Sequence, residues 1–361
     1  MRDNEQAIYD QIEQGLLGLP AANSATEAAA MAVSLHYRII RFRGKTMVEV
    51  PMPYPHFVPV DKEMFEWATK PLLGYMPRRR MNDVFAQLCY TADNLNAYDR
   101  YILLGAGTSR QTVWDMEQLE ERADIMPDDC VWRSPYVPIP TSKPIKFILG
   151  LAGGDAELYS DIMQSLAPLV MAQKPVGIIW WVGNNTDGKL ALFDVLNKIF
   201  PDQLASLTVK QLNGRRSNTP LLNSALGNVA VDGGGQITNT EIYKSIGTHE
   251  DFSMHRWHSQ GGITVRGNVH HIFAADRAPT FYMRNLSLDR RTHTVPFNQA
   301  GYAQAVSSNN ICGQLIAEMC RYAAIIKQQG YGYNWSGAGI ESKEPEPTIS
   351  RPSSSLPEFR W

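Results

Sequence analysis

The residues best suited to chemistry in this chain are two glycines and a lysine in the segment GNNTDGKL. Gly183 and Gly188 are separated by four residues, Lys189 follows directly, and an apolar run precedes the first glycine. Glycines let backbone N–H groups curl around a phosphate, and a lysine places a positive charge at its oxygens. The spacing GxxxxGK, between an expected strand and an expected helix, therefore predicts a phosphate-binding loop.

The predicted nucleotide site comprises this loop and the residue after the lysine. The position after the lysine normally holds Ser or Thr, whose hydroxyl ligates Mg²⁺. Here a leucine stands in that place, so one metal contact is missing, although ATP and Mg²⁺ remain the expected cofactors. The predicted binding residues are Gly183, Asn184, Asn185, Thr186, Asp187, Gly188, Lys189 and Leu190.

A phosphate-loop enzyme also needs a carboxylate at the end of a neighbouring strand, where it holds Mg²⁺ directly or through water. Asp232 follows the apolar segment NVAV and is the predicted metal residue. Many ATPases have a second acid beside it, but the next residue here is Gly233. The alternative role for Asp232 is that of a turn former before three glycines.

Polar and basic residues flank two further expected strands. Asp276 ends the apolar segment VHHIFAAD, where a third polar element of the site is expected. Arg290 and Arg291 directly precede the segment THTVPF. An arginine there is predicted to reach the nucleotide of a neighbouring subunit and to neutralise charge at the γ-phosphate. The predicted catalytic set is Lys189, Asp232, Asp276, Arg290 and Arg291.

A basic and aromatic segment, MHRWHSQGGITVRG, alternates around a Gln-Gly-Gly turn and predicts a hairpin. Arg256, Trp257 and His258 lie near its tip, and Arg266 lies on the return strand. Charge and ring stacking together suit single-stranded nucleic acid, so these four residues are the predicted nucleic-acid contacts. The alternative is an ordinary surface hairpin with a packed Trp257.

The remaining composition narrows the class of protein. A net charge of −2 over 361 residues excludes a globally basic nucleic-acid coat but allows a local basic channel. The 4 cysteines form no CxxC pair, and the histidines fit no zinc spacing, so free thiols and no metal besides Mg²⁺ are expected. No apolar run approaches the ~20 residues of a membrane span, which predicts a soluble, cytoplasmic protein without a membrane partner.

Periodicity predicts repeated strand–helix–strand units after residue 175, and therefore an α/β core. Gly153–Gly154–Asp155 predicts a helix break followed by an N-cap. The segment ASLTVKQLNG is expected to be a strand, and 217–226 a helix. The predicted divisions are an N-terminal α+β region (1–140), a helical collar (141–174), the core (175–300), a C-terminal helix (301–330) and a disordered tail (331–361).

The blocks WWVGNNTDGK, LLNSALGNVAVD, the hairpin, HIFAADRAP and LDRRTHTVPF, in this order, resemble the superfamily 3 helicase domain of phage, plasmid and poxvirus primase-helicases. That family has an apolar strand ending in Asn, a proline soon after it, and an Arg-Arg pair before a strand ending in Pro-Phe. The resemblance covers 140–300, and 1–140 loosely. The counterparts in this chain are Asp276, Pro279, Arg290, Arg291, Pro296 and Phe297.

The resemblance implies an AAA+ P-loop core with a central, mostly parallel sheet flanked by helices. Family members assemble as rings, usually hexamers, and pump single-stranded DNA through the centre with hairpins. Carried over by position, Lys189 would contact phosphates, Asp232 the metal and Asp276 the sensor position. Either arginine of the pair would act in trans, and the hairpin tip would lie in the channel. Expected partners are single-stranded or forked DNA, further copies of this chain, and a primase-polymerase or other replisome protein.

Three departures from the family pattern favour a second hypothesis. Leu190 replaces a hydroxyl, Gly233 stands where a second acid is common, and Asp276 replaces an amide. The first hypothesis is therefore an ATP-dependent, ring-forming DNA helicase for phage or mobile-element replication. The second is a degenerate ring subunit that binds nucleotide and DNA as a scaffold or initiator. A small-molecule phosphate-loop kinase is the third, and the arginine pair and the long N-terminal region argue against it.

Overall fold

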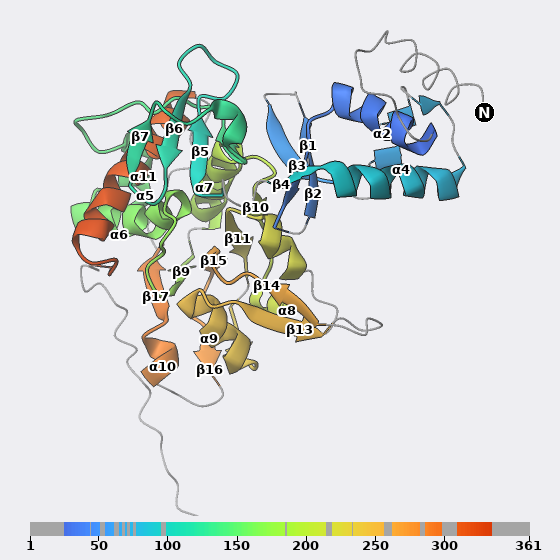
Figure 1. Ribbon diagram of the computed structural model, residues 1–361. Helices are drawn as coiled ribbons and strands as arrows, with labels where there is room; N and C mark the ends of the chain where they lie inside the picture. Colours follow the sequence, from blue (N-terminus) through green and yellow to red (C-terminus); the bar gives the residue numbers. More distant parts are fainter. Residues whose placement is uncertain are drawn as a thin grey trace, which may run out of the picture.

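The computed structural model describes residues 25–43, 45–50, 55–60, 65–66, 69–70, 73–74, 77–94, 99–184, 186–213, 219–232, 234–255, 262–281, 286–297 and 309–333. Within these ranges the chain forms a five-stranded sheet, two four-stranded sheets and two strand pairs (Figure 1). Predictions that fall on other residues, among them the disordered tail, lie outside the described part.

The N-terminal unit is a four-stranded sheet with two helices, set apart from the main body in Figure 1. The strand order is β3-β2-β1-β4, with β1, β2 and β3 antiparallel and β4 parallel to β1. The segment HYRIIRFRGKTMVEV, in which β-branched and other apolar residues alternate with polar ones, forms the antiparallel pair β1 and β2. The elements are α2 (Ala25–His36), β1 (Ile39–Phe42), β2 (Lys45–Val50), β3 (His56–Pro59), α4 (Arg78–Thr91) and β4 (Asp93–Asn94).

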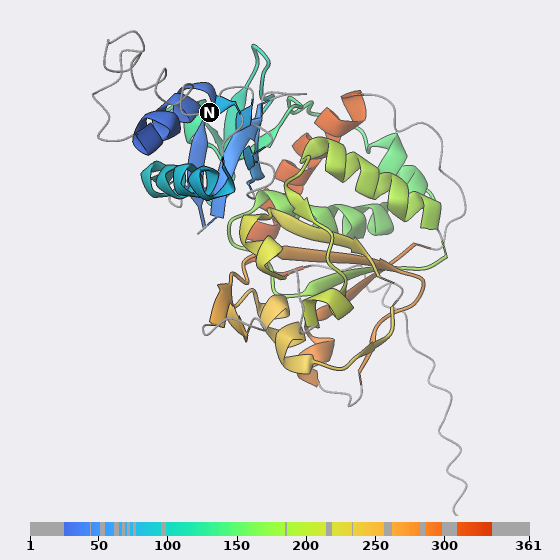
Figure 2. The same ribbon diagram turned by 90° about the vertical axis from the view of Figure 1, so that its right-hand side faces the viewer.

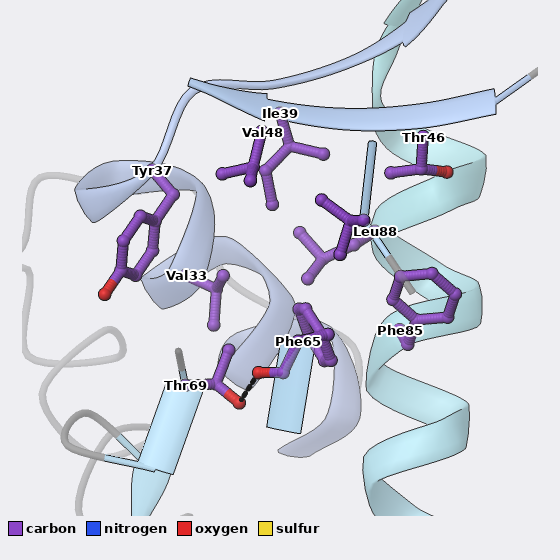
Figure 3. A pocket seen from close by; sticks show the side chains of 10 residues that line it. Val33, Tyr37, Ile39, Thr46, Val48, Phe65, Thr69, Phe85 and Leu88 are labelled. Carbon is purple, nitrogen blue, oxygen red and sulfur yellow. Dashed lines mark hydrogen bonds between the residues drawn. The ribbon is translucent and has the colours of Figure 1, made fainter. Parts of the chain in front are cut away.

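A small apolar cavity lies between the helices and the sheet of this unit (Figure 3). Its two threonine hydroxyls are already bonded: Thr69 Oγ1 donates to the carbonyl of Phe65 at 2.7 Å, and Thr46 Oγ1 lies 2.9 Å from Cys89 Sγ. Because the other lining side chains are aliphatic or aromatic, the cavity presents no polar group with which to orient a ligand. It is a feature of core packing rather than a candidate site.

A second four-stranded sheet, in the order β7-β6-β5-β8, follows. Trp132 of β8 packs edge-on against Phe42 of β1, with ring centroids 5.2 Å apart, so this sheet is joined to the N-terminal unit. On the same face, because both tryptophans are paired with Ile102, Trp114 Nε1 donates to the carbonyl of Val170 at 2.9 Å. The elements are β5 (Tyr101–Leu104), β6 (Thr112–Asp115), β7 (Glu120–Arg122), the 3₁₀ turn η2 (Pro127–Asp129) and β8 (Trp132–Ser134).

The five-stranded sheet is entirely parallel, in the order β10-β11-β15-β9-β17. Parallel strands need crossovers and are buried on both faces, which explains the unbroken apolar runs predicted as strands. The α/β core is therefore confirmed. The strands are β9 (Ile178–Val182), β10 (Leu204–Ala205), β11 (Gly227–Val231), β15 (His270–Ala275) and β17 (Thr292–Pro296).

Helices cover both faces of this sheet (Figure 2). Two adjacent tryptophans of β9 point to opposite faces: Trp181 Nε1 donates to Ser165 Oγ on one, and Trp180 Nε1 donates to Tyr243 Oη on the other, both at 3.0 Å. The first face carries α5 (Lys146–Leu151), α6 (Ala156–Leu166), η3 (Ala167–Val170), α7 (Thr186–Ile199) and α11 (Asn309–Gln328). The second carries α8 (Val209–Asn213), η4 (Thr219–Ser224), α9 (Thr240–Thr248) and α10 (Leu286–Asp289).

Local signals explain where two of these helices begin. The predicted break is confirmed, because α5 ends at Leu151 and Asp155 caps α6 by accepting from the N–H groups of Glu157 and Leu158. The strand predicted for ASLTVKQLNG is wrong beyond β10. Thr208 and Gln211 bond each other's backbone N–H groups, Thr208 N to Gln211 Oε1 at 2.8 Å and Gln211 N to Thr208 Oγ1 at 3.2 Å, and this capping box begins α8.

The predicted hairpin is confirmed as β13 (Phe252–His255) and β14 (Gly262–Val265), which are antiparallel. The short parallel pair β12 (Gln236–Ile237) and β16 (Thr280–Phe281) extends the turns after β11 and β15. All 4 cysteines are free thiols, as expected. No helix among the described residues is both long and apolar enough to span a bilayer. One hydrophobic cluster runs from Ile40 to Ile326 and joins four of the predicted divisions, whose boundaries stay predictions.

Candidate nucleotide site

The carboxyl ends of three neighbouring strands meet at one edge of the parallel sheet. Val182, the last residue of β9, is paired with Ala275 of β15, and Ala274 is paired with Val231, the last residue of β11. Because the strands end level, the residues that follow them lie in one row at this edge. Three predicted site residues occupy that row: Gly183, Asp232 and Asp276.

The Lys189 side chain lies across the carboxyl ends of β9 and β15. Its ammonium donates to the carbonyl oxygens of Gly183 at 2.6 Å and Ala275 at 2.8 Å, and lies 3.8 Å from Asp276 Oδ1. The lysine is 2% exposed, and burial lowers its pKa while the Asp276 carboxylate opposes that shift. The structure therefore brings Lys189 and Asp276 together, as predicted, with the lysine folded onto the strand ends.

The loop before Lys189 is shorter than its spacing predicts. Asn184–Gly188 was expected to be a loop throughout, but α7 begins at Thr186, so Lys189 lies in the first turn of that helix. Gly183 has φ +142°, a conformation that L side chains rarely adopt, which explains the glycine at the strand end. A helix N-terminus presents unpaired N–H groups and partial positive charge, so this edge can still attract an anion. Asn185 lies outside the described residues.

Leu190 is one of the larger apolar side chains that remain exposed, at 41%. It follows Lys189 in the first turn of α7, where the loop pattern places a metal-binding hydroxyl. Its exposure means that the surrounding residues do not require an apolar side chain. The departure from the pattern is therefore a difference in chemistry and not a demand of the core.

The Asp232 carboxylate bonds two backbone N–H groups of its own chain. Its Oδ2 accepts from the N–H of Val209 at 2.8 Å, which holds the start of α8, and its Oδ1 accepts from Gly234 at 3.2 Å. Each carboxylate oxygen keeps a second acceptor position, so these bonds do not preclude a cation. β15 separates β11 from β9, which puts Asp232 roughly 10 Å from the β9 strand at typical strand spacing.

The turn after β11 is pressed against the turn after β15. Gly234 has φ +64°, and a Cβ there would lie 2.6 Å from the carbonyl oxygen of Arg277. Only a glycine allows the two turns to lie this close together, which explains one glycine of the GGG segment. Gly233 lies outside the described residues. Among those described, no three His, Cys, Asp or Glu side chains come together in a way that could hold a metal ion.

The two predicted arginines lie at the opposite edge of the sheet. Thr292 of β17 is paired with Ile178, the first residue of β9, and both arginines directly precede it. Arg290 is exposed, whereas Arg291 Nη1 donates to the carbonyl and the hydroxyl of Ser287, both at 2.6 Å. Within one chain they are separated from Lys189 by the length of β9, about 16 Å at 3.3 Å per residue.

The predicted nucleic-acid contacts divide into two places. Arg256, Trp257 and His258 lie outside the described residues, at the turn between β13 and β14. Arg266 follows the base of the hairpin, where Phe252 is paired with Val265, and it lies 3.9 Å from Asp99. The structure therefore does not place Arg266 beside the tip, because an antiparallel return strand carries it to the other end of the hairpin.

No family model matches the chain, and no curated protein matches it significantly. Three solved apo structures of the C-terminal region of NrS-1 match at 13%, 12% and 13% identity, with TM-scores of 0.43, 0.46 and 0.46. They cover 81%, 85% and 82% of this chain, which spans 66%, 69% and 68% of theirs, about two thirds. At this identity and TM-score, the likeness identifies neither a family nor an activity.

Proposed function

We propose that the chain binds a nucleoside triphosphate at the carboxyl edge of its parallel sheet and uses it, as a ring-forming helicase, to move single-stranded DNA. The observation that carries the proposal is the position of Lys189 between the ends of β9 and β15, with Asp276 beside it and Asp232 on the same edge. Ligands of open α/β sheets bind outside the carboxyl ends of the strands.

The chemistry assigns a role to each of these groups. A triphosphate would replace the two carbonyl oxygens as partner of the Lys189 ammonium and lie against the first turn of α7. Asp232 would hold Mg²⁺ directly or through water, and the metal would neutralise charge on the phosphates. The nucleotide and water must supply most of the metal ligands, because Leu190 supplies none.

The exposed Arg290 supports an assembly of more than one copy. It lies at the edge opposite Lys189, so it could act only on the nucleotide of another subunit. Between the two arginines of the pair, Arg290 is the better candidate, because Arg291 is already bonded to Ser287. An arginine supplied in trans neutralises charge at the transferring phosphoryl group.

ATP hydrolysis with and without single-stranded DNA, measured alongside the mass of the assembled species, tests this function. We expect a ring whose turnover rises when DNA is added. A ring without turnover, unchanged by Lys189→Ala, would instead favour the scaffold, for which Leu190 is the specific observation. A monomer that fails to bind ATP would contradict both.

Replacing Leu190 by threonine is expected to raise Mg²⁺-dependent turnover at least tenfold, which corresponds to about 1.4 kcal/mol of barrier. The new hydroxyl supplies the missing metal ligand, and the exposed leucine contributes little to the core. Leu190→Ala is the matched control, because it removes the same side chain without adding a hydroxyl. Equal rates for the two variants at saturating Mg²⁺ would show that this position does not limit the reaction.

A further inference from the structure

A second cluster of charged side chains lies at the amino edge of the parallel sheet, opposite Lys189. It surrounds a cavity of about 340 Å³, including its open mouth, where both four-stranded sheets meet the core. Its residues come from the β1–β2 turn and from the segments before β5, β9 and β15. The polar lining residues, together with the aromatic floor, are Arg43, Asp99, Arg100, Lys174, Asn268 and Trp132.

Lys174 is the cation of this cavity that has no carboxylate partner among the described residues. It is 9% exposed, and its ammonium donates to the carbonyl oxygens of Pro168 and Met171, both at 2.8 Å. Among the described residues no carboxylate lies within ion-pair distance of it. Burial, assisted by the charge of Arg43, lowers the pKa of Lys174 to about 7. A lysine held in this way gains strongly from an anion, because an opposite charge restores what burial removed.

Arg43 is fixed toward the same cavity. Its backbone is in the left-handed region, at φ +47°, which is uncommon for a non-glycine residue and clusters at functional sites. Its guanidinium lies over the rings of Phe42 at 5.0 Å and Trp132 at 5.7 Å. The Nε and Nη2 groups both donate to Asp99 Oδ2, at 3.2 and 3.0 Å.

One carboxylate is shared between two cations, and a third cation has no carboxylate partner. Asp99 is bonded to Arg43 and lies 3.9 Å from Arg266 Nη1, while Lys174 has carbonyl partners. Arg100 does not add to the excess, because Asp115 and Glu117 bind it at 2.5 and 2.6 Å. Among the lining residues Asp99 offsets Arg43, so the positive charge left without a carboxylate is that of Lys174, inside a partly enclosed space where it is poorly screened. Outside the lining, the charges of Arg266 and Asp251 act on Arg43 in opposite directions.

We propose that this cavity binds a phosphate group, either free or carried on a nucleic-acid backbone. A phosphate would supply the anion that Lys174 lacks, and guanidinium and ammonium groups are its usual partners in proteins. The site is independent of the nucleotide site, because the amino and carboxyl edges of a parallel sheet lie at opposite ends of its strands. No residue is shared between the two sites.

The test uses the full chain carrying Lys189→Met, so that the nucleotide site does not contribute, and titrates inorganic phosphate by calorimetry against chloride at matched ionic strength. Lys174→Gln keeps an N–H donor for the carbonyl oxygens but loses the charge, and we expect it to weaken phosphate binding at least tenfold. Asp99→Asn removes the competing carboxylate, and we expect it to tighten binding several-fold, a gain that misfolding cannot produce. Lys146→Gln and Asp83→Asn, at exposed helix positions, are the matched charge controls.

A second arm identifies the source of the phosphate group. If a short thymidine oligonucleotide binds, is displaced by inorganic phosphate and is weakened by Lys174→Gln, the backbone is the source. If oligonucleotide binding is unaffected by inorganic phosphate and by Lys174→Gln, while Lys174→Gln weakens the binding of inorganic phosphate, the free ion is the ligand. Phosphate binding no stronger than that of chloride, or equal effects of Lys174→Gln and Lys146→Gln, would overturn the site, and neither result would bear on ATP binding at Lys189.

Discussion

Replacing Lys189 by methionine is expected to lower the affinity for ATP by one to two orders of magnitude. Hydrogen bonds to charged groups contribute about 1.5–3 kcal/mol each, and this ammonium is the cation that lies between the ends of β9 and β15. Calorimetric titration of ATP with Mg²⁺ measures the change. Lys198→Gln is the matched control, because it removes one exposed charge from the last turn of the same helix.

The stability of Lys189→Met should change much less than its affinity. Removing the buried ammonium relieves its desolvation, but it leaves the carbonyl oxygens of Gly183 and Ala275 without that donor. The two effects oppose each other, so the thermal midpoint should stay within a few degrees of the parent chain. A variant that is folded and binds ATP as tightly as the parent would place the nucleotide elsewhere.

Acidification below pH ~6.5 is expected to destabilise the fold steeply through two adjacent histidines of the central strand β15. His270 and His271 are both fully buried. Burial lowers the pKa of His271 to about 3 and that of His270 well below its ordinary value, with the charge of Lys174 contributing to both shifts. The folded state therefore holds both rings neutral, while in the unfolded chain they take up protons near pH 6.5.

The sign follows from this difference in proton binding. The contribution of His270 and His271 to the free energy of unfolding is fully present above pH ~6.5, where both rings are neutral in the folded and the unfolded chain. It decreases as the pH falls toward the pKa values of the two rings in the folded state. The expected loss is about 1.4 kcal/mol per pH unit for each histidine. Because a domain is typically stable by about 5–15 kcal/mol, two such groups can unfold it near pH 4. Denaturant unfolding at several pH values measures the slope.

Two substitutions distinguish the effect of histidine protonation on stability from the effect of side-chain packing. Neither ring nitrogen of His271 has a hydrogen-bond partner among the described residues, so His271→Leu should raise stability at pH 7 by about 1–3 kcal/mol and reduce the pH slope. His270 Nε2 lies 2.7 Å from the carbonyl oxygen of Ser165, so His270→Leu should reduce the slope but lower stability at pH 7. An unchanged slope in both variants would assign the acid sensitivity to other groups.

The position of Gly183 and Lys189 at one edge of the parallel sheet was predictable because these two residues are close together in sequence. A strand, a glycine and a lysine six residues later specify the edge of a sheet. The strand β9 is where the pattern placed it, whereas the helix α7 begins three residues before Lys189. The start of α8 was also marked, by a Thr-x-x-Gln capping box, but Leu207 and Val209, which alternate with polar residues, favoured a strand instead. Capping is local chemistry, and here it outweighed periodicity.

The amino-edge cavity could not be predicted in the same way. Its charged residues lie at positions 43, 99 and 174, and no spacing rule relates segments so far apart. Lys174 followed by proline reads as an ordinary end to a helical block, and the lysine's burial depends on how the sheet of β1 packs against the core. Tertiary packing alone turns an unremarkable lysine into the centre of a charged cavity.

The paired indoles of β9 have a mechanical consequence. Trp180 and Trp181 anchor the same strand to α9 on one side and to α6 on the other, each by a hydrogen bond at 3.0 Å. Sliding β9 along its axis would break both hydrogen bonds together, so the strand resists displacement relative to the helices on either face. Backbone movement at Gly183, which directly follows β9, is therefore expected as rotation about the backbone bonds of the loop. The helices on both faces keep their positions relative to β9.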